Sequence, residues 1–116
     1  MKIEDGYAII STPERNVRWK LSDIIYFECY KNYISVNKEN DIICFRSTMT
    51  ELEEALKDSN FIKINKGTIL NENQVSNFRK FEIVLKNGKS FSVSRRRYQL
   101  ICEHLKQVNL LTLFLF

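Results

Sequence analysis

Apolar and polar residues alternate along most of this chain, with short interruptions. Val17, Trp19 and Leu21 are separated by Arg18 and Lys20, which is the period of a strand with one buried face. Such alternation, with polar breaks between the runs, predicts strands at 7–11, 17–21, 24–28, 33–37, 42–46, 61–65, 82–85 and 90–94. Residues 69–71 fit either a strand or a short turn of helix.

Several of these runs are separated by short polar turns. Asn87-Gly88 stands between two extended runs and predicts a type I′ hairpin turn. Asn40-Asp41 predicts a second hairpin turn, and residues 29–32 form the predicted turn before the strand at 33–37. Short turns join antiparallel neighbours, so we expect antiparallel sheets.

The apolar period becomes helical in two segments. Thr48 and Glu51 match a capping box, and apolar residues follow at helical spacing as far as Leu56. The second helix is expected to follow Ser94 as its N-cap, with an apolar face that extends to Leu105. The expected fold class is therefore mainly β with short α, with several antiparallel strands in small sheets and two short helices.

The length of 116 residues suits one domain, which we expect to occupy residues 1–106. Residues 107–116 form an apolar tail without a charged side chain. The tail is too short to cross a bilayer, which takes about 20 apolar residues. Three roles for it stay open: packing on the domain as an extension of the helix, a dimer contact, or the beginning of a further segment.

Positive charge is concentrated in the last third of the chain. Residues 1–60 hold 8 Lys or Arg and 11 Asp or Glu, whereas residues 79–106 hold 8 and 2. This asymmetry suits a polyanionic partner, although a solvated basic face is the alternative. The centre of the region is Arg95-Arg96-Arg97, and a guanidinium group can bind phosphate or the O6 and N7 atoms of guanine with two hydrogen bonds. Successive helical residues point about 100° apart, so these arginines are expected to have different roles.

The sequence lacks the usual catalytic and metal-binding motifs, including a Gly-rich phosphate loop, G-x-S-x-G and Cys/His metal spacing. His104 is the one histidine, and we expect it to be a packing or solvent-facing residue. The three cysteines, with no CxxC pair, are expected to be reduced thiols, and the N-terminus lacks a signal peptide. We therefore predict a cytoplasmic protein that is not an enzyme, with no metal, cofactor, small-molecule substrate or membrane span.

Two further polar clusters fall in predicted turns. Lys31 and Asn32 lie between Tyr30 and Tyr33, and Lys63, Asn65 and Lys66 follow the first predicted helix. Lysine suits phosphate, and asparagine can pair with adenine. Taken alone, each cluster is also an ordinary polar turn.

An ordered series of short segments extends over most of the chain. In sequence order they are DIIYFE at 23–28, NYI at 32–34, RSTM at 46–49 leading into Leu52 and Leu56, FIKINK at 61–66, ILN at 69–71, the Asn87-Gly88 hairpin and VSR at 93–95. From about residue 7 to 106, this series resembles the LytTR family of bacterial DNA-binding domains. Where the family pattern has His-Arg-Ser, this chain has Asn65-Lys66-Gly67, and lysine is a less selective point charge than arginine.

The resemblance implies small antiparallel sheets and duplex DNA binding by loops in the major groove rather than by a recognition helix. Following it, the residues expected to contact bases are Asn32, Lys66, Arg96 and Arg95. The residues expected to contact phosphates are Lys31, Tyr33, Lys63, Asn65, Lys89 and Arg97.

The predicted function is sequence-specific binding of double-stranded DNA in transcription regulation, with two copies on repeated half-sites and a homodimer as an open possibility. Regulators of this family usually carry a phosphoacceptor receiver domain upstream, as in two-component response regulators. We therefore expect this chain to be either a stand-alone regulator or a fragment. The alternatives are a protein-interaction domain that uses the tail, and an RNA binder that stacks bases on Tyr30 and Tyr33.

Overall fold

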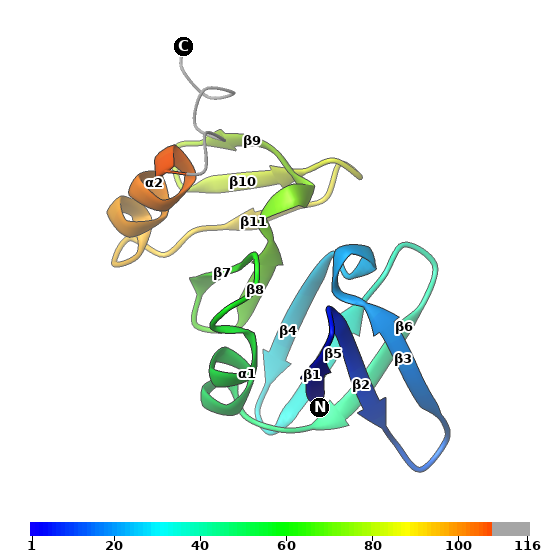
Figure 1. Ribbon diagram of the computed structural model, residues 1–116. Helices are drawn as coiled ribbons and strands as arrows, with labels where there is room; N and C mark the ends of the chain where they lie inside the picture. Colours follow the sequence, from blue (N-terminus) through cyan, green and yellow to red (C-terminus); the bar gives the residue numbers. More distant parts are fainter. Residues whose placement is uncertain (108–116) are drawn as a thin grey trace.

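A computed structural model describes residues 1–107 and places their strands in three antiparallel sheets, with two α-helices (Figure 1). The predicted fold class is confirmed. The expectations for the tail concern residues 108–116, outside the described residues, and they stay untested. The central sheet contains β4 (Tyr26–Tyr30), β5 (Tyr33–Asn37), β6 (Ile42–Arg46), β7 (Phe61–Asn65) and β8 (Thr68–Asn71), in the order β6-β5-β4-β8-β7.

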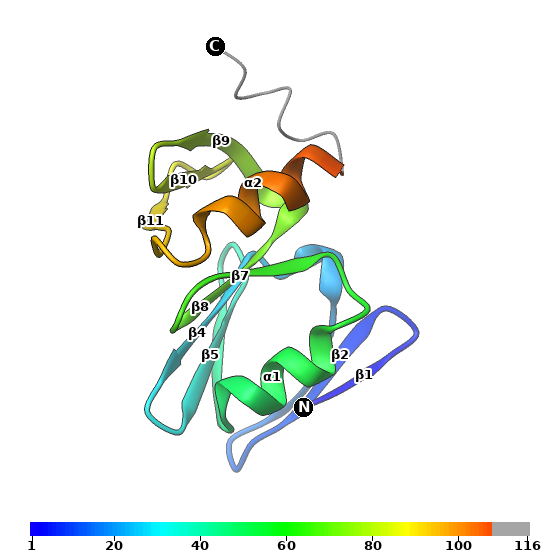
Figure 2. The same ribbon diagram turned by 90° about the vertical axis from the view of Figure 1, so that its left-hand side faces the viewer.

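Two three-stranded sheets and the helices lie on either side of this central sheet. The elements on one side are β1 (Lys2–Glu4), β2 (Tyr7–Ser11), β3 (Asn16–Lys20) and α1 (Met49–Leu56). Those on the other side are β9 (Val75–Arg79), β10 (Glu82–Leu85), β11 (Ser90–Ser92) and α2 (Tyr98–Gln107). Figure 2 shows this second group above the central sheet and α1 below β7.

The central sheet separates two apolar cores. Tyr26 and Leu70 point into the core beneath β9–β11 and α2, whereas Phe27 and Ile69 point into the core beneath α1 and β1–β3. Because strands buried on both faces carry apolar residues at successive positions, β4 and β8 do not alternate as half-exposed strands do. This explains the continuous apolar run at 24–27.

The predicted strand at 24–28 is displaced in the structure. β4 extends from Tyr26 to Tyr30, and Tyr30 pairs with Tyr33 across a two-residue loop. The predicted turn at 29–32 is therefore too long, and the loop consists of Lys31 and Asn32 alone. Lys31 takes a positive φ of 56°, which lets the chain reverse in so few residues.

The predicted type I′ turn at Asn87-Gly88 is wrong. Only Gly88 has a positive φ there, of 89°, and its N–H donates to the Leu85 carbonyl at 2.9 Å. This is a three-residue loop with a glycine bulge. A type I′ turn lies instead at Asp5-Gly6, which joins β1 to β2. Both residues there have a positive φ, 53° for Asp5 and 81° for Gly6.

The predicted N-cap of α1 is confirmed, because the Glu51 N–H donates to Thr48 Oγ1 at 3.2 Å. The Glu51 carboxylate accepts from the Thr48 hydroxyl at 3.0 Å, whereas a full capping box has it accept from the Thr48 backbone N–H. The predicted cap of the second helix is wrong, because α2 begins at Tyr98 rather than directly after Ser94. The Ser94 N–H donates to the Ile64 carbonyl at 3.0 Å, which holds Ser94 in extended chain beside β7. The predicted strand at 90–94 ends at Ser92 for the same reason.

α2 is held by its apolar face and by one polar contact. Ile101 and Leu105 are buried, and His104 Nε2 hydrogen bonds with Oε1 of the buried Glu72. His104 is therefore a packing residue that gives a buried carboxylate its partner. No helix within residues 1–107 is long and apolar enough to cross a membrane.

Candidate nucleic-acid interface

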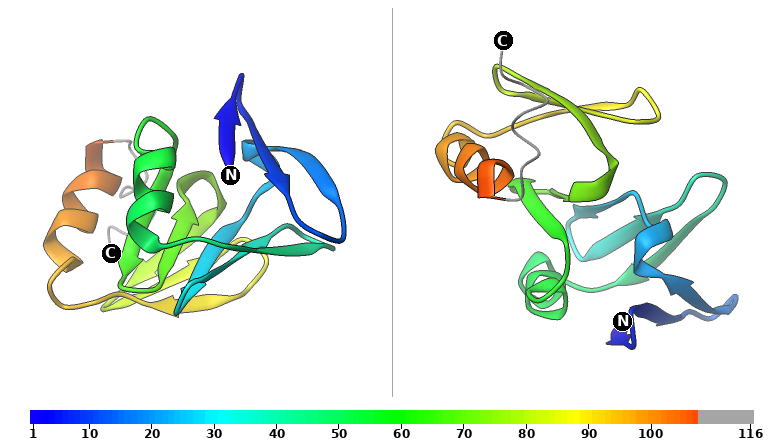
Figure 3. Two further views of the ribbon diagram at one scale, coloured as in Figure 1. Left: turned by 90° about the horizontal axis from the view of Figure 1, so that it is seen from below. Right: turned by 45° about the horizontal axis from the view of Figure 1, so that its top comes forward.

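Three loops lie on one side of the molecule. They are the β4–β5 loop at 31–32, the β7–β8 loop at 66–67 and the segment at 93–97 between β11 and α2. In Figure 2 they follow one another along the left-hand edge, and the view from below in Figure 3 also places them on one side. The antiparallel pairing of β4 with β8 accounts for part of this, because the end of one strand meets the beginning of the other.

An open groove of about 840 Å³ separates the β7–β8 loop from the segment before α2. Lys66 comes from one wall and Arg96 from the other, although the two residues are far apart in the sequence. Four of the lining residues are cations and none is acidic. The residues that line the groove are Lys63, Asn65, Lys66, Ser92, Ser94, Arg96, Arg97 and Leu100.

The three consecutive arginines have different surroundings. Arg96 and Arg97 line the groove. The Arg95 guanidinium lies 5.0 Å from the ring centre of Phe81, in the turn between β9 and β10. Arg95 and Arg96 are exposed and Arg97 is half-buried. The surroundings differ because the three arginines lie in a turn before the helix rather than in its first turn, and the different roles predicted for them stay untested.

Asn65 holds the groove together from within. Its Nδ2 donates to the Ser92 carbonyl at 2.9 Å, and its Oδ1 accepts from the Gly67 N–H at 2.9 Å. With the Ser94-to-Ile64 backbone bond, these contacts link the loop that carries Lys66 to the segment that carries Arg96. The phosphate contact predicted for Asn65 stays untested, but its side chain is already used to hold the loop.

Gly67 lies directly against the end of β4. The Cys29 N–H donates to the Gly67 carbonyl at 2.8 Å, and a Cβ atom at position 67 would lie 3.2 Å from the Cys29 carbonyl oxygen. A side chain here would require a shift of a few tenths of an ångström, so glycine suits this position because of the close approach rather than because of an unusual φ. The contact places the β7–β8 loop next to the β4–β5 loop.

The β4–β5 loop presents polar and aromatic side chains to solvent. Lys31 and Asn32 are exposed at its tip, and Tyr30 and Tyr33 beside them are 74% and 53% exposed. The Lys31 amine lies 5.6 Å from the ring centre of Tyr30. The structure thus brings Asn32, Lys31 and Tyr33 to the same side as the groove.

The structure limits the availability of Lys63. Its Nζ forms an ion pair of 2.6 Å with Glu53 Oε1 of α1, and its side chain is only 20% exposed. Its charge is thus already balanced within the protein.

Lys89 lies apart from the other predicted residues. Its amine is 5.1 Å from the ring centre of Tyr26, and a hydrogen bond with Tyr26 raises the pKa of the amine. Tyr26 begins β4 and Tyr30 ends it, so Lys89 is about 13 Å along the strand from the β4–β5 loop. Nothing tests its predicted phosphate contact, but the structure does not bring it to the groove.

This side of the molecule is suited to holding a polyanion. Arginine forks and lysine amines bind phosphate oxygens, and the exposed amide of Asn32 can pair with a base edge. In residues 1–107, no group of three His, Cys, Asp or Glu side chains is arranged to hold a metal ion. The sequence analysis missed the internal role of Asn65, which only the fold makes visible.

Comparison with known proteins bears on the family and the fold of the domain. The family profile described as the LytTr DNA-binding domain matches residues 14–106. A solved structure described as the LytTr DNA-binding domain of a response regulator from Bacillus cereus superposes with a TM-score of 0.73 at 18% sequence identity, covering 88% of this chain and 98% of that one. No curated protein sequence matches the chain. Because the profile spans most of its length, the chain belongs to the LytTR family of DNA-binding domains.

Proposed function

We propose that this domain regulates transcription by binding specific double-stranded DNA sequences through its three loops, which enter the major groove. The observation that carries the proposal is the groove in which Lys66 and Arg96 meet without an acidic residue in its lining. Cations that the protein has not already paired are available for phosphates and base edges, and phosphate contacts supply much of the affinity for DNA.

In this proposal Arg96, Lys66 and Asn32 contact bases. Arg96 suits guanine and Asn32 suits adenine, because each can form two hydrogen bonds to the base edge. Lys66 offers one point charge and is less selective. Arg95, which lies over Phe81, is proposed as a base contact second in importance to Arg96.

Phosphate contacts are assigned to Lys31, Tyr33 and Arg97 on the same side of the molecule. Lys63 contributes less, because Glu53 already balances its charge. We further propose that two copies bind repeated half-sites, and that a homodimer forms on the DNA. Duplex DNA as the partner, with the free thiols of Cys29, Cys44 and Cys102, favours the bacterial cytoplasm as the location.

A binding-site selection from random duplex DNA tests the proposal directly. We expect enrichment of a short motif that recurs at a fixed spacing. Mobility shifts of the full chain with the selected duplex, a scrambled duplex and single-stranded RNA, at two salt concentrations, then measure preference and salt dependence. We expect the selected duplex to bind tightest and every duplex affinity to fall steeply with salt.

Two outcomes would reject the proposal. The first is an absence of enrichment together with salt-independent binding. The second is a preference for single-stranded RNA, in which case the exposed rings of Tyr30 and Tyr33 would be stacking platforms for bases.

A further inference from the structure

One row of exposed side chains crosses the central sheet at the end that carries the loops. Tyr30 of β4 pairs with Tyr33 of β5, and Tyr33 pairs with Arg46 of β6. Residues directly opposite one another in neighbouring strands point to the same face, so the three side chains lie side by side. All three are exposed, and none belongs to either apolar core.

Arg46 is the one cation that β4, β5 and β6 themselves contribute, and it stands in the end row of this face. The next row inward on the same strands is Glu28, Ser35 and Cys44, which contains an exposed acid and no cation. A ligand attracted by Arg46 would therefore meet the end of the sheet rather than its middle.

Arg46 has no acidic partner within the described part of the chain. Its guanidinium lies 5.4 Å from the ring centre of Tyr33. Lys31 lies over Tyr30 in a similar way, so a cation rests on each tyrosine of the hairpin. Contact with a ring restrains a guanidinium group but leaves its N–H groups available to an anion.

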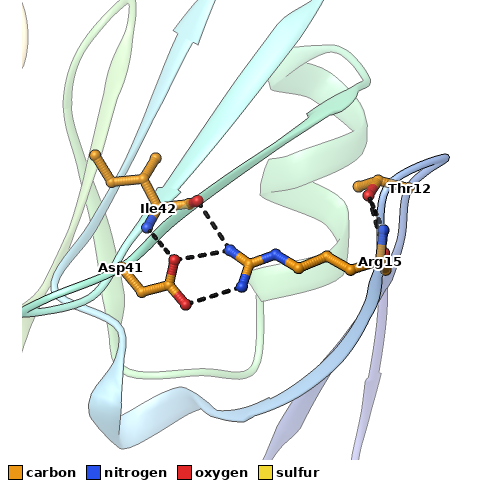
Figure 4. A network of polar contacts seen from close by, with 4 residues as sticks. All are labelled: Thr12, Arg15, Asp41 and Ile42. Carbon is orange, nitrogen blue, oxygen red and sulfur yellow. Dashed lines mark hydrogen bonds and ion pairs between the residues drawn. The ribbon is translucent and has the colours of Figure 1, made fainter.

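Arg15, beside the same strand, is an arginine that already has an acidic partner. It lines the same groove along β6 as Arg46. Its guanidinium donates to both carboxylate oxygens of Asp41, at 3.0 and 2.7 Å, and to the Ile42 carbonyl at 3.1 Å (Figure 4). These contacts occupy the N–H donors of the Arg15 guanidinium, whereas the guanidinium of Arg46 has no such partner.

The end of β6 is joined to the loops already described. The Ser47 N–H, directly after Arg46, donates to the Asn32 carbonyl at 3.0 Å. From β6 to β8 there are three interstrand spacings, or about 14 Å, which is close to the width of the DNA major groove of about 12 Å. One duplex can therefore meet Arg46 and the β7–β8 loop together.

We propose that Arg46 is a further phosphate contact, held in place on the Tyr33 ring, and that the DNA interface extends past the β4–β5 loop to the end of β6. This inference rests on the proposed function. Its partner is the sugar-phosphate backbone of the same duplex, so Arg46 adds affinity without reading sequence.

The test measures the affinity for labelled duplex DNA, by fluorescence anisotropy, over a series of salt concentrations. Each phosphate contact contributes about 0.9 to the slope of log K against log salt concentration. We expect Arg46→Ala to lower the magnitude of this slope by about 0.9 and to weaken the selected and scrambled duplexes by the same factor. Arg46→Lys should retain most of the slope, because it keeps the charge.

Arg18→Ala is the matched control. Arg18 also lies over a tyrosine, 3.6 Å from the ring centre of Tyr7, but on the sheet of β1–β3, away from the three loops (Figure 1). The Arg18→Ala substitution removes the same charge and a similar ring contact. We expect it to leave the slope of log K against log salt concentration at the wild-type value. Far-ultraviolet circular dichroism and thermal unfolding of each variant check the fold. If Arg46→Ala unfolds, Arg46→Gln replaces it.

The outcomes separate the two proposals. If Arg46→Ala keeps the wild-type slope while Arg96→Ala loses affinity for the selected site, the inference about Arg46 is wrong and the proposed function stands. If Arg18→Ala lowers the slope as much as Arg46→Ala, the effect is one of net charge and the inference is also wrong. If the wild-type protein shows no preference for duplex DNA, both proposals fail.

Discussion

The two ends of the central sheet carry the same kinds of cation in different states. At the end formed by Arg46, Lys31 and the groove, most cations rest on rings or stand in solvent without an acidic partner. At the other end Arg15 is paired with Asp41, and Lys89 lies over Tyr26 and Phe91. At this second end, which we call the closed end, Asp41 holds the Arg15 guanidinium and a hydrogen bond with Tyr26 holds the Lys89 amine. At the first end, which we call the open end, Arg46, Arg96 and Lys66 have no such partner among the described residues.

This difference shows why a count of charges is a weak guide to an interface. Lys63 belongs to the groove by position, yet its ion pair with Glu53 makes it resemble the closed end. What matters for a polyanion is whether a cation is already compensated, because breaking an existing pair costs much of what the new contact gains. Three predictions can break or sharpen the comparison.

The largest effect is expected at Arg96. Arg96→Ala should weaken binding to the selected site by about 1–3 kcal/mol and relax the preference at one base position, because a fork contact to a base edge is lost. Competition binding with a panel of single-base variants measures both effects. Lys89→Ala is the control from the closed end, and we expect little change on any duplex. Equal losses for the two variants would contradict the distinction between the ends.

A smaller effect is expected at Asn65, which supports the open end without needing to touch DNA. Asn65→Ala removes the bonds to Ser92 and Gly67 and should lower the free energy of unfolding by about 1–2 kcal/mol. DNA affinity should fall as well, because Lys66 and Arg96 lose their fixed spacing. Denaturant unfolding and anisotropy measure the two quantities.

Asn65→Asp is the informative partner variant, because it keeps an acceptor for the Gly67 N–H but lacks the donor for the Ser92 carbonyl. We expect intermediate stability. Unchanged DNA affinity in a destabilised Asn65→Ala protein would show that the spacing of the two walls does not matter.

The smallest effect is expected at the closed end. Removing the pair with Arg15→Gln and Asp41→Asn should leave both the DNA affinity and the salt slope unchanged. A hydrogen bond from Arg15 lowers the pKa of the Asp41 carboxyl. A carboxyl with a lowered pKa in the folded state stabilises the fold above its unfolded pKa, and this contribution is lost as the pH falls through the folded pKa.

The stability advantage of the wild-type protein over this double variant should therefore be constant near neutral pH and disappear below about pH 4. Thermal unfolding over a pH series measures it. An advantage that persists into strong acid would mean that the pair does not act through the carboxylate charge.

Much of the fold was predictable because the alternation of apolar residues and the polar breaks between the runs indicate the same strand ends. The strands at 7–11, 33–37, 42–46, 61–65 and 82–85 match the structure in both bounds. β9 was not predicted, because its middle residues Ser76 and Asn77 are polar and leave too short an apolar pattern. β4 was displaced because burial on both faces removes the alternation that would mark its ends.

The candidate site was predictable in its loops but not in its pairings. The sequence places Lys66 and Arg96 in separate segments, and the bonds from Ser94 to Ile64 and from Asn65 to Ser92 make them opposite walls of one groove. It also cannot tell which of three consecutive arginines faces that groove. The alternation of β6 marks Arg46 as exposed, but the absence of an acidic neighbour depends on residues distant in the chain.

The close contact of Gly67 with Cys29 has a consequence for how this surface can change in evolution. A side chain at position 67 would require β4 or the β7–β8 loop to shift by a few tenths of an ångström, whereas the exposed side chain of Lys66 is not constrained by packing. Adjacent positions thus differ in mutational freedom, with one that fixes the loop and one that can vary. Drift at position 66 alone offers a route to new operator preferences without rebuilding the fold.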